Sequence, residues 1–249
     1  MEKTITLIIV MLLVLVSSTC KPKDSNKIKE PKMVSVHGGT FIMGCSKEQE
    51  NDCVYDEIPA HQVTLSSFKI AKYPVTQDLW EQIMGYNPSY FKGANLPVEG
   101  VNWGDVQEFI RKLNEATGKK YRLPTEAEWE FAARGGNKSK GYLYSGSNEI
   151  DAVAWYDNNS HGEVHPVGAK APNELGIYDM SGNVWEWCSD WFGAYSDESL
   201  TNPQGPSTGT ARILRGGCWY TIPQMSRVSY RDYFAPENRH AFFGFRVVE

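Results

Sequence analysis

The end of the chain reads RGGCWYTIPQMSRVSYRDYFAPENRHAFFGFRVVE from Arg215 to Glu249, and it combines two kinds of residue. Arginines, glycines, a tryptophan and a proline recur as a fixed frame. Between them lie side chains of every size and polarity, which we call the mixed set: Tyr220, Thr221, Ile222, Tyr230, Asp232, Tyr233, Phe234, Ala235, His240, Ala241, Phe242 and Phe243. A segment that covers a core needs one face of consistent polarity, and the mixed set has none. The tail therefore predicts a binding surface on a constant frame.

Upstream of the tail, three segments are predicted to be helices because each begins at a capping residue and ends at a glycine. They span residues 76–85, 102–118 and 125–135. The third also has a capping box, in which Glu128 follows Thr125 by three positions.

The other ordered segments are short. The stretches typical of brief strands are GGTFIMG, HQVTLSSFKIAKYPV, RILRGG, RVSYR and GFRVV. Residues 136–181 have neither the helical nor the strand periodicity. The chain contains 8 Trp, 13 Tyr and 10 Phe, so aromatic packing is expected to hold its irregular parts. We predict one α+β domain over residues 33–249, with much irregular structure.

The chain begins with a secretory signal. Lys3 is followed by an apolar run over residues 5–16, which is shorter than the roughly 20 residues of a spanning helix. Cys20 after small residues resembles the lipobox of bacterial lipoproteins, although Ser17 stands where leucine is usual. We expect residues 1–20 to be a lipoprotein-type signal with lipidation at Cys20. Cleavage nearby and simple secretion is the alternative.

Residues 21–32 are polar, lysine-rich and aperiodic, which indicates a flexible tether. The domain would then be lipid-anchored in the cell envelope, at its outer surface, and would contact the membrane through the anchor only. The formal net charge of -5 gives no electrostatic reason to expect nucleic acid.

Four further cysteines follow Cys20. Cys45 and Cys53 flank a short acidic loop, and an exported protein meets oxidising conditions, so a disulfide between them and free buried thiols are both open. The pairing of Cys188 and Cys218 is equally open. No two cysteines have the C-x-x-C spacing, which disfavours a structural zinc site.

Several phrases occur in the order of a known family. They are GGTFIMG, KYPVT (72–76), PVEGVNW (97–103), YRLPTEAEWE (121–130), GNVWEW (182–187) and GFR (244–246). Together they resemble the formylglycine-generating enzyme, or sulfatase-modifying factor, domain over essentially the whole mature chain. The resemblance implies that family's variant of the C-type lectin fold.

Enzymes of this family oxidise a cysteine of a target sulfatase with oxygen and a copper ion held by two cysteines after the Gly-Gly pair. The resemblance places those positions at Thr221 and Ser226. Copper(I) prefers thiolate ligands and hydroxyls bind it poorly, and Cys218 alone cannot replace a pair. We therefore expect no copper and no catalysis. An oxidase of the formylglycine-generating type, acting on sulfatase cysteines, is the alternative.

The family's calcium motif remains in this sequence. The resemblance implies that Asp179, Gly182, Val184 and Glu186 hold a structural calcium ion through carboxylates and main-chain carbonyls. In the alternative, the two acidic side chains only cap turns.

Within the family, the chain resembles variable lipoproteins that retroelements diversify, of the treponemal type. There, misread template adenines turn AAY codons into codons for nearly any residue except Lys, Glu, Gln, Met and Trp. Every member of the mixed set obeys this rule. The resemblance implies a non-catalytic surface protein whose variable region, residues 215–249, binds a macromolecular ligand, which we expect to be a protein. A passive structural component of the envelope is a further alternative.

Overall fold

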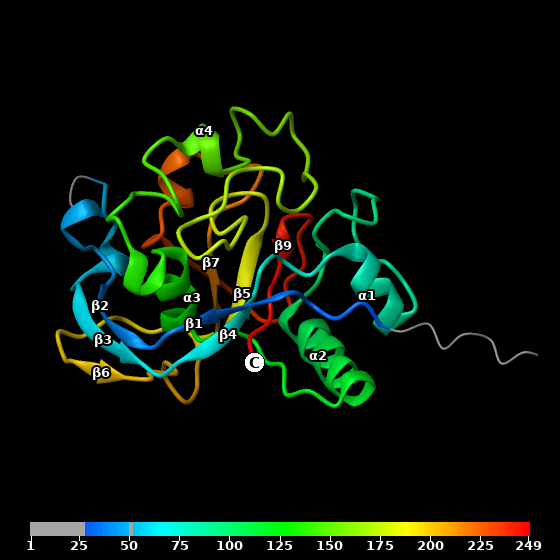
Figure 1. Cartoon of the computed structure of the whole chain (residues 1–249), viewed down its shortest axis with the longest axis horizontal. Helices are drawn as coiled ribbons and strands as arrows, with labels where there is room; N and C mark the ends of the chain where they lie inside the picture. Colours follow the sequence, from blue (N-terminus) through cyan, green and yellow to red (C-terminus); the bar gives the residue numbers. More distant parts are fainter. Residues whose placement is uncertain (1–27, 50–51) are drawn as a thin grey trace, which may run out of the picture.

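The computed structural model describes residues 28–49 and 52–249 (Figure 1). The predicted signal, the lipidation site Cys20 and most of the tether lie outside the described residues. Within those ranges, no helix is both long enough and apolar enough to cross a membrane. The described chain starts close to α1 (Gln77–Met84) and ends beside strand β4 (Phe68–Ala71) (Figure 1).

The three predicted helices are confirmed as α1, α2 (Trp103–Thr117) and α3 (Glu126–Ala133). Their caps form as expected, because the side chains of Thr76, Asn102 and Thr125 each accept a hydrogen bond from the third residue of the helix. Helix α3 ends one residue early, with Arg134 as its C-cap. The shorter helices are α4 (Ile150–Val153), η1 (Lys47–Gln49), η2 (Tyr55–Glu57), η3 (Gly136–Lys138) and η4 (Pro223–Ser226).

The strands are short and form three sheets. The first sheet pairs β1 (Met33–Val36) with β4, and the second has the order β2 (Gly39–Met43), β3 (His61–Leu65), β6 (Leu200–Thr201). The third, which carries the tail, has the order β8 (Arg231–Phe234), β7 (Arg212–Arg215), β5 (Trp185–Trp191), β9 (Phe243–Gly244). The predicted α+β class with much irregular structure is confirmed.

Two strand predictions were too long. In RVSYR only the last residue is in a strand, because Arg227 and Ser229 turn inward and bind Glu57 instead of joining a ladder. In GFRVV the strand β9 covers only Gly244 and the preceding residue, and Val248 makes isolated bridges instead.

The alternatives for the cysteines are now resolved. Cys45 and Cys53 form a disulfide, whereas Cys188 and Cys218 are free and buried. Burial in apolar surroundings raises the pKa of the Cys218 thiol to about 12, so it stays protonated at neutral pH.

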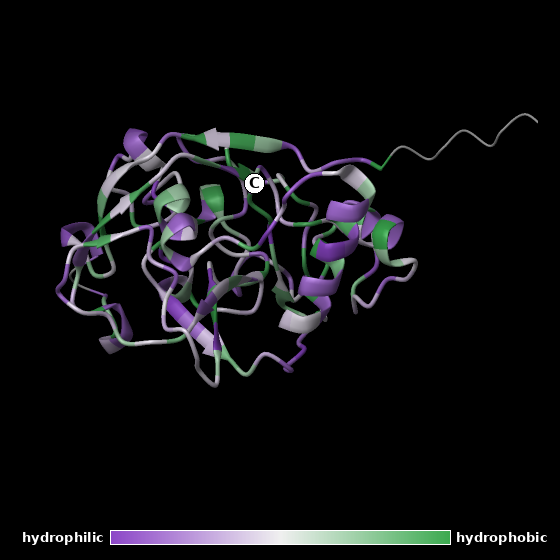
Figure 2. Cartoon of the chain, turned by 90° about the horizontal axis from the view of Figure 1, so that it is seen from below, coloured by the Kyte–Doolittle hydropathy of each residue, from purple (hydrophilic) through white to green (hydrophobic). Residues whose placement is uncertain are grey.

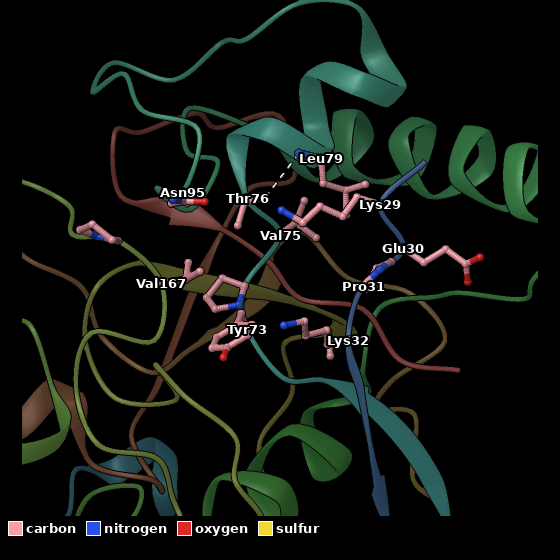
Figure 3. Close-up of a pocket in the computed structure, with 13 residues that line it drawn as sticks. Lys29, Glu30, Pro31, Lys32, Tyr73, Val75, Thr76, Leu79, Asn95 and Val167 are labelled. Carbon is pink, nitrogen blue, oxygen red and sulfur yellow. Dashed lines mark hydrogen bonds between the residues drawn. The ribbon is translucent and has the colours of Figure 1, made fainter. Parts of the chain in front are cut away.

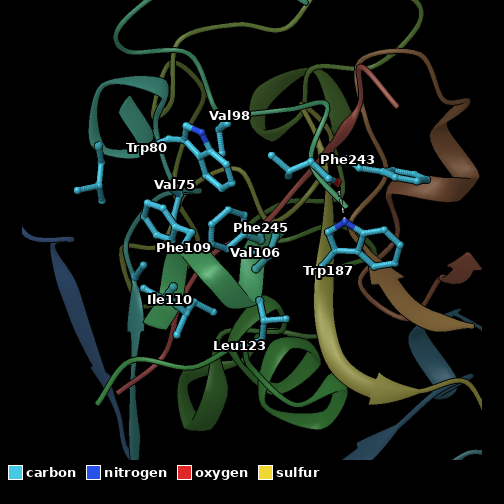
Figure 4. Packing of buried hydrophobic residues seen from close by; sticks show 14 of the residues in the cluster. Val75, Trp80, Val98, Val106, Phe109, Ile110, Leu123, Trp187, Phe243 and Phe245 are labelled. Carbon is cyan, nitrogen blue, oxygen red and sulfur yellow. Dashed lines mark hydrogen bonds between the residues drawn. The ribbon is translucent and has the colours of Figure 1, made fainter. Parts of the chain in front are cut away.

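One hydrophobic cluster joins α1 and α2 to the tail (Figure 4). Trp80 stacks on Phe109 with ring centroids 5.1 Å apart, and Phe245 meets both rings edge-on. Phe243 lies against Trp187 at 5.1 Å. The end of the chain is therefore part of the core and cannot be an independent appendage.

A second cluster packs α3 against the strands β1 to β4 and includes the fully buried Trp129 and Phe131. Hydrophilic and hydrophobic residues are interspersed along the ribbon (Figure 2). Because its helices and strands are short, the fold depends on many individual side-chain contacts between segments that are distant in the sequence.

Candidate binding surface in the C-terminal tail

The frame of the tail is anchored by four buried arginines. Each makes an ion pair with a glutamate that is far away in the sequence: Arg215 with Glu130, Arg227 with Glu57, Arg231 with Glu126 and Arg246 with Glu186. Removing one partner of such a pair leaves an uncompensated buried charge, which is costly. The pairs therefore fix the backbone from which the mixed set projects.

The mixed set lies mainly at the surface. Tyr220, Ile222 and Tyr233 are 67%, 49% and 40% exposed. The members that are half-buried are Tyr230, Asp232, Phe234, Ala235, His240, Ala241 and Phe242. The distinction between frame and mixed set in the sequence thus corresponds largely to a distinction between inside and outside.

Two members of the mixed set lie inside, and their assignment to a surface was wrong. The hydroxyl of Thr221 accepts a hydrogen bond from the Cys218 N–H and donates one to the Cys218 carbonyl, both at 2.9 Å. Phe243 is fully buried between Trp187 and Phe234. These two residues belong to the frame.

Aromatic rings of the mixed set form a continuous row. Tyr220 stacks on Phe242 at 6.3 Å, Phe242 stacks on His240 at 4.9 Å, and His240 meets Phe234 edge-on at 5.7 Å. A contiguous, partly exposed aromatic patch is typical of recognition surfaces. Tyr233 lies apart from this row and stacks on Phe192 at 3.8 Å.

The row continues into a loop that we had not predicted to be part of the site. Trp219 meets Phe91 edge-on at 5.6 Å, and Phe91 meets Tyr90 at 5.0 Å. Tyr90 is 76% exposed. The only signal in the sequence was the aromatic content of a Gly- and Asn-rich loop, which gave no reason to place the loop beside the tail.

Buried polar side chains hold this loop in place. Gln77 donates to the carbonyl of Phe91 and accepts from the N–H of Gly93, and Glu99 accepts from the N–H of Phe91 at 2.9 Å. The other oxygen of Glu99 is buried without a partner. Burial raises the pKa of Glu99 to about 7.

The positions that carry copper ligands in the family are poorly suited to metal chemistry here. Thr221 is engaged with the Cys218 backbone, and the Ser226 hydroxyl is buried without a hydrogen-bond partner. Cys218 is the only tail thiol, and it is protonated at neutral pH. These side chains do not fit a copper(I) site, which requires thiolate ligands.

The expected calcium residues lie around one turn, but they fit a calcium site only in part. Glu186 accepts hydrogen bonds of 2.7 Å from Trp129 Nε1 and from two nitrogens of Arg246, so both of its oxygens are occupied. Asp179 accepts from the Gly168 N–H at 2.7 Å, and burial raises its pKa to about 6. In the described part of the chain, no group of three or more His, Cys, Asp or Glu side chains is placed to hold a metal.

A cavity of about 320 Å³ lies between residues 29–32 and the segment that leads into α1 (Figure 3). Val75 and Leu79 are among the residues that line it, together with Tyr73. No member of the mixed set lines this cavity, so it is not part of the candidate binding surface.

The short sheets, the three helices and the long irregular segments are arranged as in the C-type lectin-like fold of the formylglycine-generating enzymes. The chain belongs to the family described as the sulfatase-modifying factor enzyme 1-like domain, whose model matches residues 18–249.

Relatives of the chain include a protein named as a chaperone, formylglycine-generating enzymes and a variable protein. Chaperone protein LppX of Paenibacillus barcinonensis is 35% identical and aligns with 93% of each chain. Formylglycine-generating enzyme of Streptomyces coelicolor is 36% identical over 68% of this chain and 57% of its own. Among solved structures, Treponema denticola variable protein 1 superposes with a TM-score of 0.80 at 31% identity, over 87% of this chain and 94% of its own.

Proposed function

We propose that this protein is a non-catalytic, surface-displayed binding lipoprotein whose tail forms the ligand site and is diversified by a retroelement. The proposal rests on one observation: the residues of the mixed set, which vary in size and polarity, are also the residues that the tail exposes. Ten of the twelve mixed-set residues are exposed or half-buried, while the glycines of the frame and all of its arginines except Arg239 are buried. Similarity to Treponema denticola variable protein 1 supports the same reading.

The proposed ligand is a protein. The aromatic row presents tyrosine, which offers a large contact area at small conformational cost, and Asp232 and His240 add polar groups that can direct hydrogen bonds. The net charge of -5 argues against a nucleic acid partner. Membrane contact is proposed through lipidated Cys20 alone, with the domain at the outer face of the envelope.

The binding proposal predicts that substitutions in the exposed part of the mixed set remove binding without unfolding the protein. We expect the double variant Tyr220→Ser/Ile222→Ser to lose at least tenfold in affinity on an array of extracellular proteins, because both side chains are largely exposed. Tyr55→Ser is the matched control, since Tyr55 is 86% exposed in η2, outside the tail. If the double variant binds the array as the parent does, the proposed site is wrong.

The diversification proposal has a test in the DNA. Each mixed-set codon should end in C or T, and a near-copy of the tail with adenines at these positions should lie near the gene, with a reverse transcriptase. A neighbourhood without such a copy would rule out the mechanism while leaving the binding proposal intact.

An oxidase remains the second candidate because of the similarity to formylglycine-generating enzymes. It requires copper-dependent oxygen uptake with a sulfatase-type cysteine peptide. Uptake that is abolished in Cys218→Ser would establish the oxidase and overturn the non-catalytic proposal.

Calcium stays a proposal for the turn at residues 179–186. Since Glu186 is occupied by Arg246, Asp179 and the carbonyls of Gly182 and Val184 would have to provide most of the binding. Calcium at about 100 times its Kd should stabilise the fold by about 2.7 kcal/mol relative to EDTA, and Asp179→Asn should remove the difference. Equal thermal midpoints of the parent in calcium and in EDTA would show that the ion pair with Arg246 replaces the metal.

A further inference from the structure

Arg212 differs from the other arginines of the chain. The remaining eight, Arg111, Arg122, Arg134, Arg215, Arg227, Arg231, Arg239 and Arg246, each form an ion pair with an Asp or Glu. Within the described residues, Arg212 has no carboxylate within 4.0 Å. It is therefore a half-buried cation without a direct ion pair, and the acid that interacts with it from beyond this distance is Asp190.

Two tryptophans hold the guanidinium of Arg212 in a fixed plane. Its central carbon lies 3.5 Å from the ring centroid of Trp191 and 4.0 Å from that of Trp103. Trp191 is the cross-strand neighbour of Arg212 in the sheet, and Trp103 is fixed by a hydrogen bond of 3.0 Å from its indole N–H to the Cys188 carbonyl. The side chain is thus pre-organised, so a ligand would pay little to order it.

The hydrogen-bond donors of Arg212 are only partly used. Nη1 donates to the carbonyl of Ser189, and Nε is buried without a partner. Nη2 makes no hydrogen bond in the described part of the chain and, unlike Nε, is not fully buried, so it is the donor that a ligand can reach. The nearby acid Asp190 makes no ion pair with Arg212 within 4.0 Å; its Oδ2 accepts from the Glu126 N–H and the Ser189 hydroxyl, and burial raises the pKa of Asp190 to about 7, which weakens it as a counter-charge.

The open space beside Arg212 is a cleft of about 700 Å³, a size typical of small-ligand sites. Polar side chains that include Gln107, Thr125 and Gln204 line it together with Trp103. The two charged pairs at its wall are internally neutralised, since Arg122 binds Glu128 and Glu249 binds Lys69. Among the charged side chains that line the cleft, Arg212 is therefore the one without a direct ion pair.

We propose that this cleft is a carboxylate-binding site in which Arg212 receives a planar carboxylate of a small organic acid or an acidic side chain. Both indole rings lie close against the guanidinium and favour a flat ligand beside it. A carboxylate can accept a hydrogen bond from Nη2, the donor that is not fully buried, whereas the additional oxygens of a tetrahedral sulfate or phosphate would crowd the indole rings. The proposal does not depend on the proposed function of the tail.

The test is a nuclear magnetic resonance titration of the mature chain with sodium succinate, observing the indole N–H signals of Trp103 and Trp191. We expect a saturable shift of both signals with a Kd of about 1 to 10 mM, the range for a small ligand held by few contacts. Sodium chloride at equal ionic strength should not produce it. Absence of a saturable shift in the parent protein overturns the proposal, whatever the variants do.

Two variants and a control identify the group responsible. Arg212→Gln should weaken succinate binding at least tenfold, and Arg212→Lys should weaken it similarly because lysine keeps the charge but loses the planar fork. Arg239→Gln is the matched control, since Arg239 is an exposed arginine paired with Asp105, and it should bind as the parent does. Full affinity in Arg212→Lys, or sulfate binding tighter than succinate, would overturn the assignment to a planar carboxylate.

Discussion

Buried carboxyl groups of this domain differ according to whether an arginine reaches them. Hydrogen bonds from Arg227 and Ser229 outweigh burial and lower the pKa of Glu57. Glu99 has no such partner, and burial raises its pKa to about 7. At slightly acidic pH, Glu57 beneath the tail is thus charged, whereas Glu99 beneath the Tyr90 loop is largely protonated.

Glu99 should make stability depend on pH in a predictable direction. Its pKa is raised from 4.5 to about 7 in the folded state, so the unfolded chain loses this proton first as the pH rises. As the pH rises from about 4.5 to about 7, the free energy of unfolding of the parent therefore falls. Glu99→Gln removes this fall, because glutamine does not titrate. We expect the variant to gain about 1 to 3 kcal/mol on the parent between pH 4 and pH 8.

Urea denaturation of both proteins across this range measures the effect. All other titrating groups are shared, so the difference between the two curves isolates Glu99. A difference that stays constant from pH 4 to pH 8 would show that folding does not shift the pKa of Glu99.

At the level of elements, α3 is an internal connector. All eight of its residues are buried, although three of them are glutamates. Glu126 and Glu130 bind arginines of the tail, and Glu128 binds Arg122. The three glutamates of this helix can be buried because arginines from three other segments neutralise their charges.

We expect Glu130→Gln to destabilise the fold by about 3 to 5 kcal/mol, because it leaves Arg215 without its direct carboxylate partner in the interior. The control is Glu108→Gln on α2, whose partner Arg111 is solvent-exposed, and it should leave the denaturation midpoint almost unchanged. Equal denaturation midpoints for the two variants would mean that the buried pair contributes no more than a surface pair.

Secondary structure was predictable where its causes are local. The three helices followed from capping residues that act within one turn. Strand lengths were less accurate, because the inward turn of Arg227 depends on Glu57, which is 170 positions away.

Most residues of the candidate site could be predicted from the sequence, but the boundary between the site and the core could not. Residue chemistry identified the mixed set, yet the burial of Phe243 is decided by Trp187 in another strand. The contact of Phe91 with Trp219, which brings the Tyr90 loop to the site, and the ion pair of Glu186 with Arg246 are also long-range contacts that no local pattern records.

The whole molecule combines two hydrophobic clusters with very short strands and one disulfide. Cys45 and Cys53 are 8 positions apart and lie outside both clusters. The disulfide should therefore stabilise the domain without being required for the fold.

Replacing both cysteines by serine should lower the free energy of unfolding by about 2 to 3 kcal/mol, the amount expected for closing a loop of this length. Guanidinium denaturation with and without reductant checks it. The parent should become less stable on reduction, and the double variant should not respond. A double variant that loses its native near-ultraviolet circular dichroism would instead make the disulfide a condition of folding.

The inward side chain of Thr221 also has a practical meaning for combinatorial libraries built on this domain. Its neighbours Tyr220 and Ile222 are largely exposed and could be randomised freely. Thr221 itself closes a small ring of hydrogen bonds with Cys218, so most random codons there would yield misfolded clones. A library that keeps Thr221 and Phe243 constant would vary only the ten remaining positions of the mixed set.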